Sequence, residues 1–195
     1  GLLDHGAVQA DIGDQPFHLQ RDGAGLVVHR GDVRLGTQPG VAFLEQPFRD
    51  NDLASTVRLA RVSPIPLCAD ESAHSLEAIT EWQRAGAIAG VNLKTIKLGG
   101  TAATLRAAIV SDTLGLAVVL AAKIAESSVG TAGLIHLGLV LPNLAWGMNP
   151  TSHYLAEDIV RLPLAPAGGT STRPSGSGLG VDVDESAIRR WRAKL

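Results

Sequence analysis

Residues 41–94 read VAFLEQPFRDNDLASTVRLARVSPIPLCADESAHSLEAITEWQRAGAIAGVNLK, and this stretch decides the fold. It contains three short apolar runs, and each run stops at a charged residue: Glu45, Asp70 and Lys94. Amphipathic segments with helical spacing separate the runs. Nearly continuous apolar strands that alternate with amphipathic helices are typical of a parallel sheet covered by helices.

The same alternation continues further along the chain. A helix is predicted over 101–114 and a fourth apolar strand over 116–122, with Lys123 and Glu126 just after it. An apolar helix then extends to residue 141. In a βα-barrel the carboxyl ends of the strands carry the active site. The charged residues therefore recur at the end of each strand where a barrel performs chemistry.

The regions on either side of this pattern are less regular. Residues 1–40 stay unassigned apart from a possible short strand at 26–29 between turn-forming pairs. Residues 41–162 are predicted to form the βα units. Residues 163–195 begin with a segment rich in Pro, Gly, Ser and Thr, which predicts an extended tail, and end in a short helix capped by Asp184.

Composition excludes several classes of protein. Hydrophobic residues make up 45% of the 195 positions and charged residues 18%, which is typical of a globular domain. The net charge of −2 gives no general attraction to nucleic acid or to anionic membranes. No apolar run reaches the ~18 residues of a membrane span. The single cysteine, Cys68, excludes an internal disulfide and favours a cytoplasmic location.

The residues at the strand ends suggest metal-assisted acid–base chemistry. Two carboxylates on neighbouring strands, Glu45 and Asp70, can converge on a hard cation such as Mg²⁺. A lysine beside a metal ion gives up its proton more readily, so Lys94 could act as a general base. The metal would stabilise negative charge on a substrate carboxylate while the base removes the neighbouring carbon-bound proton. The simpler alternative is that Glu45 merely ends a strand at the surface.

Five segments also resemble one family in the order in which they occur. They are FLEQP at 43–47, ADES at 69–72, VNLK at 91–94 followed by Lys97 and Gly99-Gly100, ESSVGT at 126–131 and GLGV at 178–181. Together they resemble the muconate-lactonizing subgroup of the enolase superfamily, of the mandelate racemase/muconate-lactonizing type, over about residues 41–185. The resemblance implies an α/β fold, the C-terminal part of a TIM-like (β/α)7β barrel.

The resemblance also implies roles for individual residues. Glu45 and Asp70 would be metal ligands for Mg²⁺, or Mn²⁺ in its place, and Lys94 the catalytic acid/base. Lys123, Glu126 and Ser127 would contact substrate, while Glu71 and Asn92 would support the site from outside the ligand shell. The implied enzyme is an isomerase or lyase that acts on a small carboxylate-containing substrate (cycloisomerase, racemase/epimerase or dehydratase). In the full-length family it would be a homo-oligomer.

Two motifs of that family are missing from the sequence. These are a Lys-x-Lys motif, which carries the opposite-face base, and an Asp-x-Asn motif, which supplies the first metal ligand. Asp11, Asp14 and Asp22 lie before Glu45 without the expected context. We therefore treat residues 1–40 as a truncated or frame-altered remnant. This leaves a second hypothesis, a non-catalytic fragment with an incomplete metal site.

The roles of Lys123, Ser127 and Ser128 each allow a second interpretation. Lys123 could bind a second anionic group of the substrate, or it could pair with Glu126. Ser127 and Ser128 could be ordinary helix caps, which does not exclude a substrate contact. A parallel sheet could also belong to a doubly wound nucleotide-binding fold. That fold would need a glycine-rich turn after its first strand, and the sequence has none.

Overall fold

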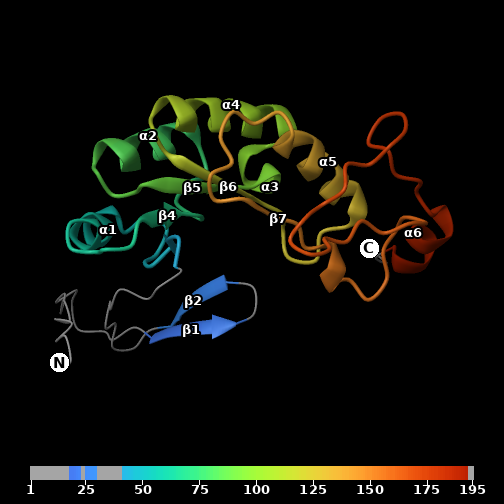
Figure 1. The fold of residues 1–195 in the computed structure, drawn as a ribbon, viewed down its shortest axis with the longest axis horizontal. Coiled ribbons are helices and arrows are strands. Elements are labelled where there is room, and N and C mark those ends of the chain that lie inside the picture. The colour runs from blue at the N-terminus through green and yellow to red at the C-terminus, as the bar shows by residue number, and fades with distance from the viewer. Residues whose placement is uncertain (1–17, 23–24, 30–40, 193–195) are drawn as a thin grey trace. The chain divides into compact units, whose positions relative to one another are not determined.

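The computed structural model describes residues 18–22, 25–29 and 41–192. The expected short strand at 26–29 is confirmed: β1 and β2 form an antiparallel hairpin in which His18 lies opposite His29. The rest of the assignment for residues 1–40 lies outside the described residues. Figure 1 follows the elements along the chain. In order they are β1 His18–Asp22, β2 Gly25–His29, β3 Leu44–Glu45, α1 Leu53–Ala60, β4 Leu67–Ala69, α2 Leu76–Arg84, β5 Gly90–Leu93, α3 Thr95–Leu98, α4 Thr101–Thr113, β6 Ala117–Ala121, α5 Ser128–Gly138, β7 Met148–Asn149, a 3-10 turn Ser152–Tyr154, and α6 Glu185–Trp191.

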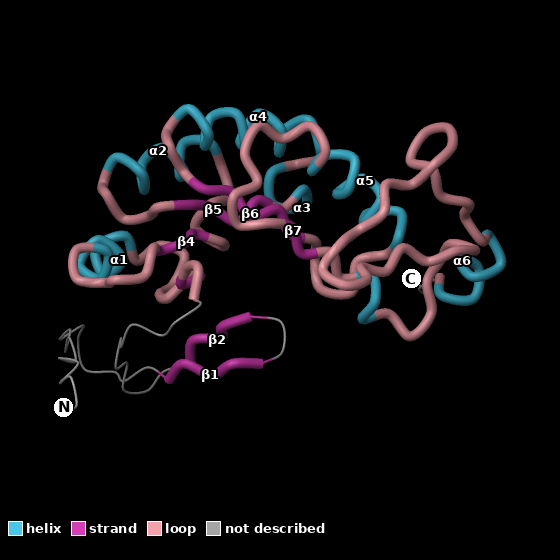
Figure 2. The backbone as a smooth tube through the Cα atoms, viewed as in Figure 1, coloured by secondary structure: helices cyan, strands magenta, loops and turns pink. Residues whose placement is uncertain are grey.

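The predicted alternation of strands and helices is confirmed. Five strands form one sheet in the order β3-β4-β5-β6-β7, which is also their order in the sequence. The registered pairs are parallel, with Leu44 opposite Leu67, Cys68 opposite Gly90 and Leu120 opposite Met148. Figure 2 shows the short strands joined by helices and loops. Parallel neighbours need such crossover connections, which is why the helices recur between strands.

The described chain divides into two compact units. The first contains the described residues up to Asn92 together with Thr113–Ala117, and the second contains Leu93–Asp112 with the residues from Val118 onward. Within the first unit a core cluster joins Leu44 of β3, Leu59 of α1, Leu67 of β4 and Ile65 of the loop before β4. The apolar runs that precede Glu45 and Asp70 in the sequence thus supply this core.

Local capping explains where the helices of the first unit begin. Asp52 caps α1 by accepting a hydrogen bond from the main-chain N–H of Ser55 at 3.0 Å. Ser75 caps α2 in the same way, at 3.1 Å from the N–H of Ala78. On α2, Ile79 is fully buried, so the amphipathic pattern buries one face of this helix.

In the second unit, α5 is capped from a distant loop. The buried carboxylate of Asp158 accepts the N–H of Ser128 at 2.9 Å and the Ser128 hydroxyl at 2.7 Å. Ser127, at the N-cap position, makes no side-chain capping bond. Of the two interpretations that the sequence allowed for Ser127, capping by its own side chain is therefore not what the structure has.

The end of the chain departs from the prediction in two places. Helix α5 ends at Gly138, short of residue 141, because Pro142 follows and disfavours a helix before it. The following β7 has only two residues and was not predicted. The irregular segment after residue 162 and the cap at Asp184 are confirmed, the latter by bonds from the N–H groups of Ser186 and Ala187.

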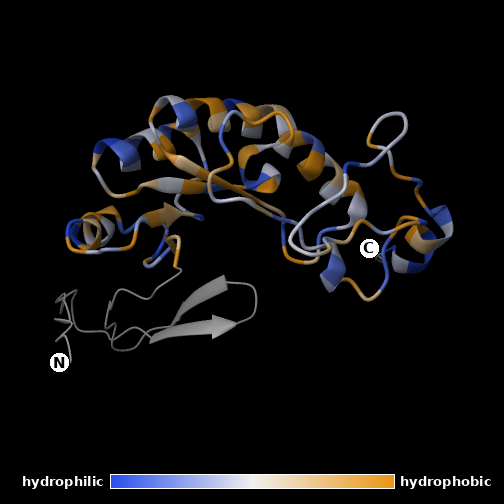
Figure 3. Ribbon diagram, in the orientation of Figure 1, coloured by the Kyte–Doolittle hydropathy of each residue, from blue (hydrophilic) through white to orange (hydrophobic). Residues whose placement is uncertain are grey.

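Strand β6 illustrates the apolar character of the sheet. In Figure 3 it is coloured as apolar along most of its length, and four of its five residues are buried. Burial on both faces is expected of a parallel strand covered by helices. None of the helices in the described part of the chain is long and apolar enough to cross a bilayer.

Candidate functional site at the strand ends

The strand bounds place the predicted site residues at or just after carboxyl ends. Glu45 is the last residue of β3, and Asp70 follows the last residue of β4. Lys94 directly follows β5, and Lys123 lies two positions beyond β6. All residues of β4 and β5 are buried, and a charged side chain follows directly after each of these two strands.

Within the first unit the structure brings Glu45 and Asn92 together. The side-chain amide of Asn92, which is 4% exposed inside β5, donates a hydrogen bond from Nδ2 to Oε1 of Glu45 at 2.8 Å. Glu45 is partly buried. An amide donor that holds one carboxylate oxygen fixes the direction of the other, which is how groups outside a ligand shell orient a metal ligand.

Asp70 is held by a residue that the sequence analysis did not single out. Asp70 is 5% exposed, and its main-chain N–H donates to Oε1 of Gln46 at 2.8 Å. The N–H of Ser72 donates to the same oxygen at 3.2 Å. Nε2 of Gln46 donates to the Ser72 hydroxyl at 2.8 Å and to the Phe48 carbonyl at 3.0 Å. One side chain therefore ties the end of β3 to the end of β4.

The backbone of Gln46 is in an unusual conformation. Its φ is +40°, in the left-handed region, and it precedes Pro47, which disfavours compact backbone conformations before it. Residues in such sparsely populated regions typically cost ~1–3 kcal/mol each and persist when their surroundings hold them. The four side-chain hydrogen bonds of Gln46 are that support. The only signal in the sequence was the Gln-Pro pair after a strand.

The remaining residues near these strand ends differ in their surroundings. Glu71 is exposed, and among the described residues its carboxylate makes no hydrogen bond or ion pair. Lys94 is partly buried and occupies the N-cap position of α3, where its carbonyl accepts the N–H groups of Lys97 and Leu98 at 3.1 and 3.2 Å. The turn of α3 therefore fixes the backbone from which the Lys94 side chain extends.

In the second unit, a tight loop joins β6 to α5. Oε2 of Glu126 accepts the main-chain N–H of Lys123 at 2.9 Å, and the N–H of Glu126 donates to the Thr151 hydroxyl at 3.2 Å. Ala125 between them has a φ of +54°. Glu126 thus meets the main chain of Lys123, whereas the predicted pairing concerned its ammonium group, and Lys123 itself is exposed.

Gly130 leaves room for this carboxylate. A Cβ atom at that position would lie 2.3 Å from Oε1 of Glu126, closer than atoms can approach. The absence of a side chain at Gly130 is therefore what lets Glu126 fold back over the first turn of α5.

Comparison with known proteins identifies the family. The family model described as enolase C-terminal domain-like matches residues 6–187. The chain belongs to the enolase C-terminal domain-like family. Among the relatives of this family member is muconate cycloisomerase 1 of Rhodococcus opacus, which is 32% identical over 153 residues, 78% of this chain and 41% of the relative. N-succinylamino acid racemase of Thermus thermophilus is 30% identical over 150 residues, 76% of this chain and 40% of the relative.

Solved structures agree with this family. The muconate lactonizing enzyme from Pseudomonas putida superposes with a TM-score of 0.72 at 32% identity, over 78% of this chain and 42% of that one. The predicted fold class is confirmed: the enolase C-terminal domain-like chain has the α/β architecture of part of a TIM-like barrel. The chain spans about two fifths of the length of the curated relatives it matches.

The donor set at the strand ends of this enolase C-terminal domain-like chain fits a hard divalent ion in part. Glu45 and Asp70 offer only carboxylate oxygens, the ligands that Mg²⁺ prefers, and Mg²⁺ commonly keeps several water or substrate oxygens beside one or two carboxylates. Among the residues that the structure describes, no group of three or more His, Cys, Asp or Glu could hold a metal ion. The fit is therefore that of a two-carboxylate site.

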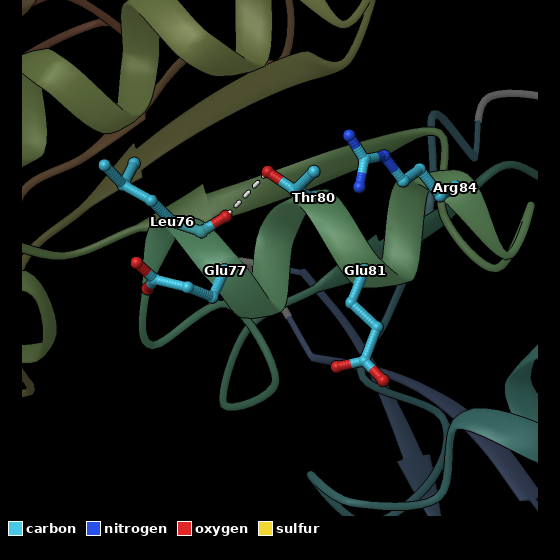
Figure 4. Close-up of a pocket in the computed structure, with 5 residues that line it drawn as sticks. All are labelled: Leu76, Glu77, Thr80, Glu81 and Arg84. Atoms are coloured by element: carbon cyan, nitrogen blue, oxygen red, sulfur yellow. Dashed lines mark hydrogen bonds between the residues drawn. The ribbon is translucent and has the colours of Figure 1, made fainter.

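A surface hollow of about 480 Å³ lies elsewhere, along α2 (Figure 4). It is lined by Leu76, Glu77, Thr80, Glu81 and Arg84. The Thr80 hydroxyl in this hollow is used within the helix, because it donates to the Leu76 carbonyl at 2.8 Å. Hydrogen bonds from its own main-chain N–H and from the Ser75 hydroxyl hold the pKa of Glu77 below its usual value. The hollow is on a helix rather than at the strand ends, so we assign it no part in the chemistry.

Proposed function

We propose that this chain is the metal-binding and proton-transfer portion of a Mg²⁺-dependent isomerase or lyase that removes a proton next to a substrate carboxylate. Family membership supports the general class, because the relatives named above include a muconate cycloisomerase and a racemase. Glu45 and Asp70 are the proposed metal ligands and Lys94 the proposed acid/base. Mn²⁺ can take the place of Mg²⁺ in a site of this kind.

The observation that carries the proposal is the hydrogen bond from Asn92 to Glu45. A buried amide that orients a strand-end carboxylate at 2.8 Å is the arrangement expected around a metal ligand. A glutamate that merely ended a strand at the surface would need no buried partner. When bound, the metal would stabilise negative charge that develops on the substrate carboxylate.

Other residues of the chain would transfer the proton and contact the substrate. Nζ of Lys94, on a backbone fixed by α3, would accept the carbon-bound proton and return it to the product. Lys123, Glu126 and Ser127, on the loop between β6 and α5, would contact the rest of the substrate. Such a loop position agrees with the general use of βα-loops in barrels. Glu71, which is exposed, would act only from outside the ligand shell.

Several features of the whole protein belong to the same proposal. The substrate would be a small carboxylate-containing molecule, and the full-length protein would be a homo-oligomer located in the cytoplasm. The single, buried Cys68 agrees with a reducing compartment. The net charge of −2 gives no support for a nucleic-acid partner.

A second candidate is a non-catalytic chain with an incomplete metal site. The observation in its favour is that the described residues hold no group of three or more metal-ligating side chains. In this case Glu45 and Asp70 would bind a divalent ion weakly, and Lys94 would have no substrate proton to accept.

Solvent deuterium exchange separates the two candidates. The chain is incubated in D₂O with Mg²⁺ and a panel of small carboxylates, and the proton next to the carboxylate is followed by NMR. The proposal predicts exchange that Lys94→Ala slows by about 10²–10⁴-fold while Mg²⁺ affinity stays the same. Arg84→Ala, which removes an exposed cation on α2, is the control and should exchange normally. Exchange that survives Lys94→Ala would overturn the role of Lys94, and metal binding without any exchange would favour the second candidate.

A further inference from the structure

The side chain of Gln46 uses all of its hydrogen-bonding capacity within the chain. A carboxamide has two donors and an acceptor oxygen with two lone pairs. Oε1 accepts the N–H groups of Asp70 and Ser72, while Nε2 donates to the Phe48 carbonyl and the Ser72 hydroxyl. The partners also fix the orientation of the amide, because the two N–H groups require the oxygen and the carbonyl requires the nitrogen.

The bonds of Gln46 reach both proposed metal ligands. Gln46 is the residue after Glu45, and its main-chain N–H donates to the Cys68 carbonyl at 2.9 Å. Its side chain holds the N–H of Asp70 itself. The backbone of one ligand is therefore joined to the backbone of the other through a single side chain.

Further contacts hold the Gln46 side chain in place between the ends of β3 and β4. The Ser72 hydroxyl, in a residue that is 1% exposed, donates onward to the Asp50 carbonyl at 2.9 Å. Gln46 keeps a left-handed backbone before Pro47, a conformation that needs surrounding contacts to persist. The turn after β3 is thus shaped around the side chain of Gln46 rather than around the backbone preference of its sequence.

We propose that Gln46 is a positioning residue, which sets the separation of the Glu45 and Asp70 carboxylates and so the affinity of the site for a divalent ion. This inference rests on the proposed function, because it assumes that these two carboxylates bind the metal. Carboxylate sites lose affinity when supporting hydrogen bonds are removed, typically by about 10–100-fold. Gln46 would touch neither substrate nor metal, since its polar atoms are occupied.

The test compares Gln46→Met with Gln83→Met in the full chain. Both replace a partly buried glutamine by a side chain of similar length without hydrogen bonds, but within the described residues the Gln83 side chain bonds only to the Leu114 carbonyl, at 3.4 Å. Two measurements are made on each folded, metal-stripped variant. Mn²⁺ affinity is measured by calorimetric titration, and the exchange of the Asp70 and Ser72 main-chain amides is measured by NMR.

Gln46→Met is expected to weaken Mn²⁺ binding by about 10–100-fold and to speed exchange of those two amides, while Gln83→Met changes neither. A merely structural glutamine would lower thermal stability without moving the affinity of the folded variant. Unchanged affinity in Gln46→Met, with the wild type binding normally, would overturn the positioning role and leave the proposed function standing. No saturable binding by the folded wild type would overturn both.

A second variant covers the case in which Gln46→Met does not fold. Ser72→Ala keeps both bonds to Oε1 of Gln46 but removes the hydroxyl that holds Nε2. It is expected to weaken Mn²⁺ binding several-fold, less than the loss of the whole amide. Wild-type affinity in folded Ser72→Ala would then overturn the inference.

Discussion

Removal of the Asp158 carboxylate should destabilise the second unit strongly. Asp158 is 8% exposed, and its oxygens accept the N–H and hydroxyl of Ser128 and the N–H of Ile159 at 2.7–2.9 Å. Asp158→Ala would leave the N–H and hydroxyl of the buried Ser128 without this acceptor and α5 without its cap. A lost cap costs ~0.5–2 kcal/mol. Unsatisfied buried donors add ~1–3 kcal/mol. We expect a loss of about 3 kcal/mol in the free energy of unfolding.

Thermal and denaturant unfolding measure this loss directly. In a chain of this size 1 kcal/mol shifts the melting temperature by ~2–4 °C, so Asp158→Ala should melt about 6–12 °C below the wild type. Asp182→Ala is the matched control, because it breaks an exposed ion pair with Arg161, and such pairs contribute ~0–1 kcal/mol. If the two variants lost the same small amount, the cap would not stabilise α5 and the account of this helix would be refuted.

Three further predictions concern other parts of the chain. Gly130→Ala should displace the Glu126 carboxylate, which a Cβ would meet at 2.3 Å, yet change stability by less than about 1 kcal/mol, because alanine favours a helix. Calorimetry should show little change while exchange of substrate protons slows, and a large loss of stability would contradict this. Ile79→Ala, at a fully buried position, should cost ~2–5 kcal/mol in denaturant unfolding, and a cost below that range would mean that α2 is not packed as described. The bond from the Ser186 hydroxyl lowers the pKa of Asp184, so this cap stabilises α6 at pH values above the ordinary value of 3.8 and is lost as pH falls through the lowered pKa. The stability difference between wild type and Asp184→Asn should therefore shrink on acidification, and a constant difference would contradict it.

Structural features that depend on residues close together in the sequence were predictable. An apolar run that stops at a charged residue located the ends of β3, β4 and β5, because burial and charge are properties of neighbouring positions. The cap at Asp184 followed from its place directly before the predicted terminal helix. The order of the five motifs along the chain was then sufficient to identify the family.

Features that depend on distant partners were not predictable. The cap of α5 comes from Asp158, 30 residues beyond Ser128, and nothing near either residue indicates the bond. Gln46 acts through Asp70 and Ser72, 24 and 26 residues away. Strand β7 has only two residues, which is too short to show a period, so it was not predicted.

The most direct test of the central claim is a Mn²⁺ titration of the metal-stripped chain, wild type against Glu45→Gln. Glu81→Gln, the same change at an exposed position on α2, is the control. The account predicts saturable binding in the wild type and in Glu81→Gln, and loss of that binding in Glu45→Gln with the fold retained. Equal binding by all three folded proteins would contradict it, because Glu45 would then not be a ligand.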